Sequence, residues 1–284
     1  KTKLNPSENI MPSHCTTSSD NCIGCGTCIL VCPKRLLILD NGRPKMIEGR
    51  EHLCNDCGQC TAYCPVGAAI HNGILAADLE KTSMPSSSAS KTIIQALKQR
   101  RSYRSFSSQP VKQSDLEKIL EVVGYAPSGG NNRFLRLIIT KPETTKKFLE
   151  LIAQWFDGDC RTDPVYGKRY ASKIDSILER YRAGQDPILR NAPSVVFSVG
   201  PKTAVWGGVE SGINLTYFNL VAETMNIGCC FAGYATAAAK RSREVRELLG
   251  IKEDEECFSA MCFGYKTIRA QRIPTRRLVE FKTV

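Results

Sequence analysis

Eight cysteines near the N-terminus stand in two runs with the same spacing. Residues 22–33 read CIGCGTCILVCP and residues 54–65 read CNDCGQCTAYCP, so each cysteine and the final proline recur 32 positions later. Thiolate sulfur is a preferred protein ligand of iron–sulfur clusters and of zinc. A C-x2-C-x2-C loop followed by a fourth cysteine wraps a compact inorganic body, so the repeat predicts metal and electron-transfer chemistry.

Zinc is the alternative metal for such a pattern. Zinc ribbons use two separated C-x2-C pairs with four ligands in all, whereas this chain has two identical runs of four cysteines. We therefore interpret the repeat as two [4Fe–4S] sites. Residues 20–73 resemble bacterial-type two-cluster ferredoxins, with the cysteine motif complete in both halves.

That resemblance implies how the ligands are shared between the clusters. In two-cluster ferredoxins the fourth cysteine of each run ligates the cluster of the other run. The first cluster is then expected on Cys22, Cys25, Cys28 and Cys64, and the second on Cys54, Cys57, Cys60 and Cys32.

A second group of residues that could do chemistry lies at 98–106, KQRRSYRSF. Arg100 and Arg101 end a predicted helix, and Ser102 and Arg104 follow. Basic residues at a helix C-terminus can simply complement the helix dipole. Two or three guanidinium groups and a hydroxyl can also bind a phosphomonoester through charge-assisted hydrogen bonds. The segment alone leaves both interpretations open.

Three further segments follow in order: YAPSGGNNRFLRLIIT at 125–140, IGCCFAGY at 227–234 and FGYKTIRAQRIPTRRL at 263–278. Together with 98–106 they resemble the nitroreductase family of FMN enzymes, across about residues 92–284. The resemblance implies an α/β sandwich that works as a homodimer, with FMN at the dimer interface. It also implies that the flavin carries the chemistry, so we expect no catalytic side chain.

The resemblance carries over residue by residue. It implies that the FMN phosphate and ribityl chain bind Arg100, Arg101, Ser102 and Arg104 of the first segment. The turn with Pro127, Ser128, Gly129 and Asn131 is expected to reach the flavin from the partner subunit. A backbone N–H at Ala232 or Gly233 is expected near flavin N5, and Arg276 and Arg277 at the phosphate.

Composition limits the remaining possibilities. The chain of 284 residues has 42% hydrophobic and 24% charged residues and a net charge of +11, typical of a soluble globular protein. Nucleic acid is not an expected partner, because no dense Lys/Arg run occurs and two clusters and one FMN would lower the charge to roughly +5. No apolar run approaches the roughly 18 residues of a membrane span, and the N-terminal segment shows no secretory signal. We expect a cytoplasmic, anaerobic setting and an acidic electron donor.

The helices and strands predicted along the chain indicate an α+β fold. We predict a two-cluster ferredoxin domain at 1–80, a Ser-rich linker at 81–91 and a flavin domain at 92–284. Helices are predicted for 74–81, 92–102, 110–125 (capped by Ser114) and 208–226, and for most of 141–190. Strands are predicted for 134–140, 193–200 and 256–265. The segment 227–234 is predicted to be a turn.

The predicted electron path runs from a low-potential donor through the clusters to FMN and on to an organic acceptor, most simply a nitro or quinone-like compound. The donor is expected to be ferredoxin or a similar reductase, with NAD(P)H possible. Two alternatives stay open: reduction of an activated C=C or halogenated metabolite, and electron transfer or redox sensing without a dedicated substrate. His14, His52 and His71 all precede the flavin domain, and structural roles are expected for them.

Four aromatic residues and two cysteines stay ambiguous in the flavin domain. Trp155, Phe156, Tyr166 and Tyr170 could cover the flavin or pack in the core. Cys229 and Cys230 adjoin the predicted flavin turn, where redox activity or burial would each be consistent with their type.

Overall fold

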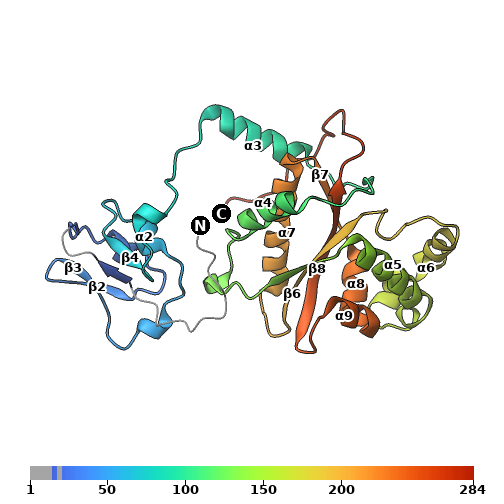
Figure 1. Cartoon of the computed structure of the whole chain (residues 1–284), viewed down its shortest axis with the longest axis horizontal. Coiled ribbons are helices and arrows are strands. Elements are labelled where there is room, and N and C mark those ends of the chain that lie inside the picture. Colours follow the sequence, from blue (N-terminus) through green and yellow to red (C-terminus); the bar gives the residue numbers. More distant parts are fainter. Residues whose placement is uncertain (1–14, 18–20) are drawn as a thin grey trace. The chain divides into compact units, whose positions relative to one another are not determined.

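The computed structural model describes residues 15–17 and 21–284. Contacts divide the chain into two compact units, Lys1–Met84 with Gly130–Asn132, and Pro85–Gly129 with Arg133–Val284 (Figure 1). The helix α3, Ser87–Gln99, begins inside the predicted linker 81–91. Serines that looked like a flexible tract act as a helix start instead, because the Ser86 hydroxyl accepts a hydrogen bond from the Ala89 N–H at 3.1 Å.

The first unit repeats itself structurally as it does in sequence. Two short helices, α1 (Thr27–Leu30) and α2 (Gln59–Ala62), each follow a glycine in the left-handed region, Gly26 and Gly58. Two antiparallel ribbons complete the unit: β1 (Cys15–Thr17) with β4 (Ala69–His71), and β2 (Leu37–Asp40) with β3 (Arg43–Met46). Short 3-10 turns, η1 and η2, lie at Glu51–Leu53 and Ala76–Asp78. The helix predicted for 74–81 is therefore wrong, since only one 3-10 turn forms there.

The second unit is a four-stranded antiparallel sheet of order β5-β6-β8-β7 between two layers of helices (Figure 1). The strands are β5 Arg136–Ile139, β6 Ser194–Pro201, β7 Ile227–Phe231 and β8 Glu255–Tyr265. The helices after α3 are α4 Gln113–Val123, α5 Pro142–Asp157, α6 Tyr166–Arg182, α7 Gly207–Thr224, α8 Gly233–Arg241 and α9 Arg243–Leu249, with 3-10 turns η3 Gly129–Asn131 and η4 Asp159–Arg161.

Alternation along the central strands explains the two layers. Val195 and Phe197 of β6 pack in one core with α5, α6, α8 and α9, whereas Val196 packs in the other core with α4 and α7. Because successive side chains of a strand point to opposite faces, a strand buried on both faces is a continuous apolar run. The run 194–200 is buried throughout. The α+β class and the sandwich are confirmed.

Three sequence predictions for this unit need correction. Residues 227–231, predicted as a turn, form the edge strand β7, which pairs with β8 from Ile227 opposite Tyr265 to Phe231 opposite Met261. The predicted cap Ser114 is not the cap of α4, whose N-cap residue is Lys112. Helices α8 and α9 were not predicted, because the run 233–241 consists of small and basic residues that carry little apolar periodicity.

Candidate functional sites

The eight cysteines of the repeat line two separate cavities in the first unit. One is lined by Cys22, Cys25, Cys28 and Cys64, together with Ile23, Gly26, Thr27, Pro44, Pro65, Val66, Ala68 and Ala69. The other is lined by Cys32, Cys54, Cys57 and Cys60, together with Cys15, Lys34, Leu36, Leu37, Met46, Asn55, Gly58 and His71. The structure thus groups the cysteines as the crossed ligand sets require, three from one run and the fourth from the other.

Backbone geometry gives the two crossed cysteines the same environment. The Leu36 N–H donates to Cys32 Sγ at 3.4 Å, and the Ala68 N–H donates to Cys64 Sγ at 3.2 Å. In both pairs the donor lies four residues after the cysteine, and the proline that ends the run lies between the two. An N–H aimed at a ligating sulfur stabilises negative charge on a cluster and helps to set its reduction potential. The residues present therefore fit a pair of thiolate-bound clusters.

The second cavity has polar groups for which the first has no equivalent. His71 is buried on its wall, with Nε2 at 3.1 Å from Asp56 Oδ1, and Asn72 Nδ2 donates to the same oxygen at 2.7 Å. His71 is also close to Cys60, and a hydrogen bond to that thiol raises the pKa of the imidazole. A buried ring nitrogen needs a polar partner, so its place beside Cys60 fits a hydrogen bond toward a cluster-ligating sulfur.

Sequence reasoning gave His71 only a structural role. The pairing of β1 with β4 places Cys15 opposite His71, at the same cavity. The signal for His71 was present in the sequence, because it follows the second run at a position that holds Leu39 after the first. His52 is exposed, and His14 lies outside the described residues.

The predicted phosphate segment lies beside β7 in the second unit. Ser102 forms a bridge with Cys229, and the Tyr103 N–H donates to the Cys229 carbonyl at 2.8 Å. This pairing carries the chain from Arg101 to Arg104 along the edge of the sheet. Arg100 and Arg101 are half-buried, whereas Ser102 and Arg104 are exposed. The edge strand that the sequence reading missed is therefore the element that positions the arginines.

A cavity of about 390 Å³ opens where β7 ends. Arg104, Ala232 and Gly233, three of the predicted cofactor-binding residues, lie on its wall. The Ala232 N–H donates to the Ala260 carbonyl at 2.8 Å and is used within the sheet. Gly233 begins α8, and the first N–H groups of a helix have no intrahelical acceptor. The donor available to a flavin on this wall is thus the start of α8 rather than the Ala232 N–H.

The predicted cofactor-binding residues of the Pro-Ser-Gly-Gly-Asn turn and of the C-terminal segment do not line this cavity. Pro127 and Ser128 precede η3, and the Gly129 N–H donates to the buried carboxylate of Glu210 on α7 at 2.7 Å. Asn131 is half-buried with a φ of 58°. The prediction that this turn reaches the flavin of a partner subunit stays a prediction.

Arg276 and Arg277 are exposed in the C-terminal segment. The start of that segment is attached to the phosphate segment, since the Thr267 and Ile268 N–H groups both donate to the Tyr103 hydroxyl at 2.8 Å. The predicted role of the two arginines at the phosphate also stays a prediction.

The exposed fraction of each side chain helps to decide between the two roles left open for the aromatic residues and for Cys229 and Cys230. Trp155 and Phe156 belong to the core, at 5% and 0% exposure, so packing is their role in this chain. Tyr170 packs in the same core and lines the cavity next to Gly233. Burial also raises the pKa of the Cys229 thiol, which faces the other core. Cys230 is only half-buried and lines the cavity, as does Cys262, its pairing partner on β8.

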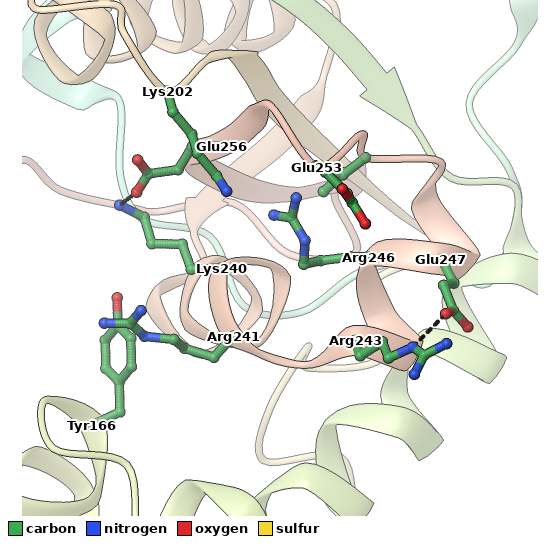
Figure 2. A pocket seen from close by; sticks show the side chains of 10 residues that line it. Tyr166, Lys202, Lys240, Arg241, Arg243, Arg246, Glu247, Glu253 and Glu256 are labelled. Atoms are coloured by element: carbon green, nitrogen blue, oxygen red, sulfur yellow. Dashed lines mark hydrogen bonds and ion pairs between the residues drawn. The ribbon is translucent and has the colours of Figure 1, made fainter.

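A second, larger cavity of about 860 Å³ lies between α8, α9 and the start of β8 (Figure 2). Its wall carries Lys202, Lys240, Arg241, Arg243 and Arg246, but carboxylates match several of these cations. Lys240 pairs with Glu256 at 2.6 Å and Arg243 with Glu247 at 2.8 Å, as the dashed lines in Figure 2 show. Because these cations are already paired with carboxylates, we interpret the charges on this wall as stabilising the surface of the fold and not as a binding site for an anion.

No helix within the described parts of the chain has the length and apolar character needed to cross a membrane.

Comparisons with known proteins agree with both sites. The Nitroreductase family model matches residues 97–265, and the 4Fe-4S dicluster domain model matches residues 21–69. An FMN reductase [NAD(P)H] of Bacillus subtilis is 26% identical over 187 residues, 64% of this chain and 69% of the relative. A ferredoxin of Pyrobaculum islandicum is 44% identical over 50 residues, which are 17% of this chain and 44% of that ferredoxin.

Among solved structures, a nitroreductase with bound FMN from Bacteroides fragilis has the same fold. It superposes with a TM-score of 0.53 at 21% identity, and the match covers 68% of this chain and 96% of that one. The family model covers more than half of the chain, and the dicluster match falls on the two cysteine runs. The chain therefore belongs to the nitroreductase family and is an oxidoreductase, in which a 4Fe–4S dicluster domain of the ferredoxin type precedes the family domain.

Proposed function

We propose that this oxidoreductase takes single electrons from a low-potential donor at two [4Fe–4S] clusters and delivers them, through FMN, to a small organic acceptor. The observation that carries the proposal is the presence, on one chain, of two four-cysteine cavities and a nitroreductase-family domain. When bound, the clusters carry single electrons and the flavin collects two of them for the acceptor. Nitro or quinone-like compounds are the acceptors that the family favours.

The side chains of this protein have binding and positioning roles in that scheme. Four thiolates hold each cluster, and the Leu36 and Ala68 N–H groups stabilise charge on the crossed cysteines. Arg100, Arg101 and Ser102 supply charge-assisted hydrogen bonds for a phosphomonoester. The N-terminus of α8, at Gly233, presents N–H groups and a positive dipole end to the cavity, which favours negative charge there.

Reduction of a nitro group to a nitroso group consumes two electrons and two protons and releases water. No histidine lies in the second unit, because the three histidines of the chain are His14, His52 and His71. Protons are therefore proposed to come from water, or from a tyrosine on the cavity wall such as Tyr170 or Tyr234.

A homodimer is part of the proposal, and exposed apolar side chains support it. Ile93, Ile94 and Leu97 of α3 are about half exposed, at 55%, 52% and 49%, and Trp206 at the start of α7 is 62% exposed. Phe281 in the C-terminal segment is 80% exposed. Leu97 lies four residues after Ile93 and three after Ile94, so the three side chains share one face of α3, and an exposed apolar face usually marks an interaction site. Sedimentation of the holoprotein should give a dimer, and Trp206→Asp should shift it toward monomer.

The electron-entry claim is tested by comparing donors under anaerobic conditions. Reduced ferredoxin, or a viologen radical as a one-electron donor, should reduce the flavin faster than NAD(P)H does. Cys57→Ala should slow reduction by the one-electron donors. Cys160→Ala should not, because its thiol is buried in the core of the second unit, outside both cluster cavities and outside the cavity at the end of β7.

The Bacillus subtilis relative is named for NAD(P)H, so direct hydride reduction is the competing result. Rapid reduction by NAD(P)H that Cys57→Ala leaves unchanged would contradict entry through the clusters. If no nitro, quinone or alkene acceptor reoxidises the reduced protein, the reductase proposal is wrong and the chain is an electron carrier.

A further inference from the structure

The cavity at the end of β7 carries an unusual balance of charge. Its wall contains Arg104, Arg169, Lys173 and Arg190, and neither an aspartate nor a glutamate. The other lining residues are Tyr170, Pro187, Ile188, Cys230, Phe231, Ala232, Gly233, Tyr234 and Cys262. Four cations thus face a space that is otherwise apolar and aromatic. Pockets of this kind use a few polar groups to orient and select a ligand.

Within residues 15–17 and 21–284, no carboxylate forms an ion pair with any of these four cations. Lys240 and Arg243 at the larger cavity, by contrast, do form such pairs. The acidic residue of the loop before β6, Asp186, accepts hydrogen bonds from the Ile188 and Leu189 N–H groups at 3.0 and 2.7 Å. Its carboxylate is therefore engaged by the backbone.

The positions of the cations suit one shared ligand. Arg169 and Lys173 are four residues apart on α6, so they lie on the same face of that helix. Arg190 is half-buried with a φ of 62° and comes from the loop before β6. Arg169 and Lys173 are exposed, and all three cations line the same cavity, so together they make the potential at this wall positive. An arginine fork beside a lysine suits a carboxylate.

The cofactor does not account for all of this charge. Arg104 is the one cation on this wall that is assigned to the cofactor, and Arg100, Arg101 and the C-terminal arginines do not line the cavity. Arg169, Lys173 and Arg190 are assigned to no part of the FMN. Resting on the proposed function, we propose that the organic acceptor is itself an anion, an aromatic carboxylate. Its charged group binds Arg169, Lys173 and Arg190.

The aromatic part of the cavity wall suits the ring of such an acceptor. Tyr170 and Tyr234 meet edge to face with ring centroids 5.1 Å apart, and Phe231 beside them is 46% exposed. An exposed ring next to two fixed tyrosines offers a surface for a flat ligand. The acceptor's ring lies against these side chains while its carboxylate reaches α6.

The test uses the holoprotein and two acceptors of similar size and shape, the anion 4-nitrobenzoate and the neutral 4-nitrobenzamide. The double variant Arg169→Gln/Lys173→Gln removes two cations from this wall. Arg243→Gln removes one cation from the other cavity and is the matched control. We expect the double variant to raise KM for 4-nitrobenzoate roughly tenfold or more, and to leave KM for 4-nitrobenzamide within about twofold. The control should leave both unchanged.

Binding is measured separately from turnover, so that the inference and the proposed function can fail independently. Benzoate and benzamide are titrated into the oxidised holoprotein while the flavin absorbance is followed. Tighter binding of benzoate, lost in the double variant, supports the inference even if neither nitro compound is turned over. The absence of turnover in the wild type would count against the reductase proposal alone.

Three results would overturn the inference. Equal affinity of the wild type for benzoate and benzamide would show that the cations do not select an anion. An equal loss for both ligands in the double variant would show a general packing effect. A fall in FMN affinity, measured by flavin fluorescence on dilution, that matches the fall in benzoate affinity would assign these cations to the cofactor.

Discussion

The imidazole of His71 lies 3.1 Å from the carboxylate of Asp56, on the wall of the second cysteine cavity. The positions 32 residues earlier hold Leu39 and Gly24, which cannot form such a pair. An imidazole close to a cluster stabilises the added negative charge of the reduced form by donating a hydrogen bond or carrying a positive charge, whereas a carboxylate opposes it. We therefore expect His71→Leu, which removes the imidazole and leaves the Asp56 carboxylate, to lower the reduction potential of the second cluster and to leave that of the first unchanged. Redox titration followed by EPR measures both, and two potentials that His71→Leu leaves unchanged would contradict this role.

The crossed ligand sets predict how cysteine variants combine. The holoprotein should contain about eight iron atoms, and Cys25→Ala or Cys64→Ala should each remove about four. Because both residues line the first cavity, the double variant Cys25→Ala/Cys64→Ala should lose no more iron than either single variant. Cys57→Ala/Cys64→Ala should lose nearly all of it, since Cys57 lines the second cavity.

Iron analysis and EPR after anaerobic reconstitution decide between these outcomes. Cys230→Ala is the control, because its thiol lies outside both cavities. If Cys57→Ala/Cys64→Ala retained half of the iron, Cys64 would belong with Cys57 and the ligand sets would not be crossed.

Arg136 and Glu255 form a two-point ion pair in the second unit. The Nε and Nη2 atoms of Arg136 lie 2.8 and 2.7 Å from the two carboxylate oxygens of Glu255. Hydrogen bonds from Arg136 lower the pKa of Glu255 from 4.5 to about 2. The pair therefore stabilises the fold above pH 4.5, and this contribution is lost as the pH falls toward 2. Because Arg136 is 43% exposed, Glu255→Gln should cost only about 1 kcal/mol at pH 7.

Urea unfolding followed by tryptophan fluorescence reports on this unit, since both tryptophans, Trp155 and Trp206, belong to it. The difference between Glu255→Gln and the wild type should shrink as the pH is lowered from 5 to 2.5. Glu247→Gln breaks an exposed pair with Arg243 and should change the unfolding free energy by at most about 0.5 kcal/mol. A cost for Glu255→Gln that stays constant with pH would mean that its charge is not what stabilises the unit.

Gly228 allows Tyr103 to approach the edge strand. A Cβ at position 228 would lie 2.4 Å from the Cγ atom of Tyr103, so Gly228→Ala must displace the whole Tyr103 ring. The Tyr103 hydroxyl accepts both the Thr267 and the Ile268 N–H groups, and these bonds would be lost with it. We expect a loss of about 1–3 kcal/mol in the free energy of unfolding and weaker FMN retention, because Arg104 follows Tyr103 directly.

Gly233→Ala is the control for this substitution, because a Cβ at position 233 meets no atom within 4 Å. It should change the unfolding free energy much less than Gly228→Ala does. Equal stability of the two variants in urea would show that Tyr103 moves without cost.

Much of the chemistry was predictable because it is encoded locally. The two cysteine runs contain their own spacing, their prolines and their left-handed glycines, so thiolate ligation follows from residues close together in sequence. The central strand at 194–200 was equally clear, because burial on both faces demands an unbroken apolar run. The strand at 227–231 was missed, since Gly228, Cys229 and Cys230 are small residues with weak strand preference, and only pairing with β8 makes them a strand.

The thiolate repeat, the α+β class and the segments that resemble a flavin domain can therefore all be predicted from the amino-acid sequence. Which groups share a space depends on the tertiary structure. It placed Cys15 opposite His71 at the second cavity, set Arg101–Arg104 along β7, and brought Arg169 and Lys173 of α6 to the same wall as Gly233. The reason is physical: ligand spacing within a loop is set by a few backbone dihedral angles, whereas the neighbours of a cavity come from long-range packing, which no local pattern records.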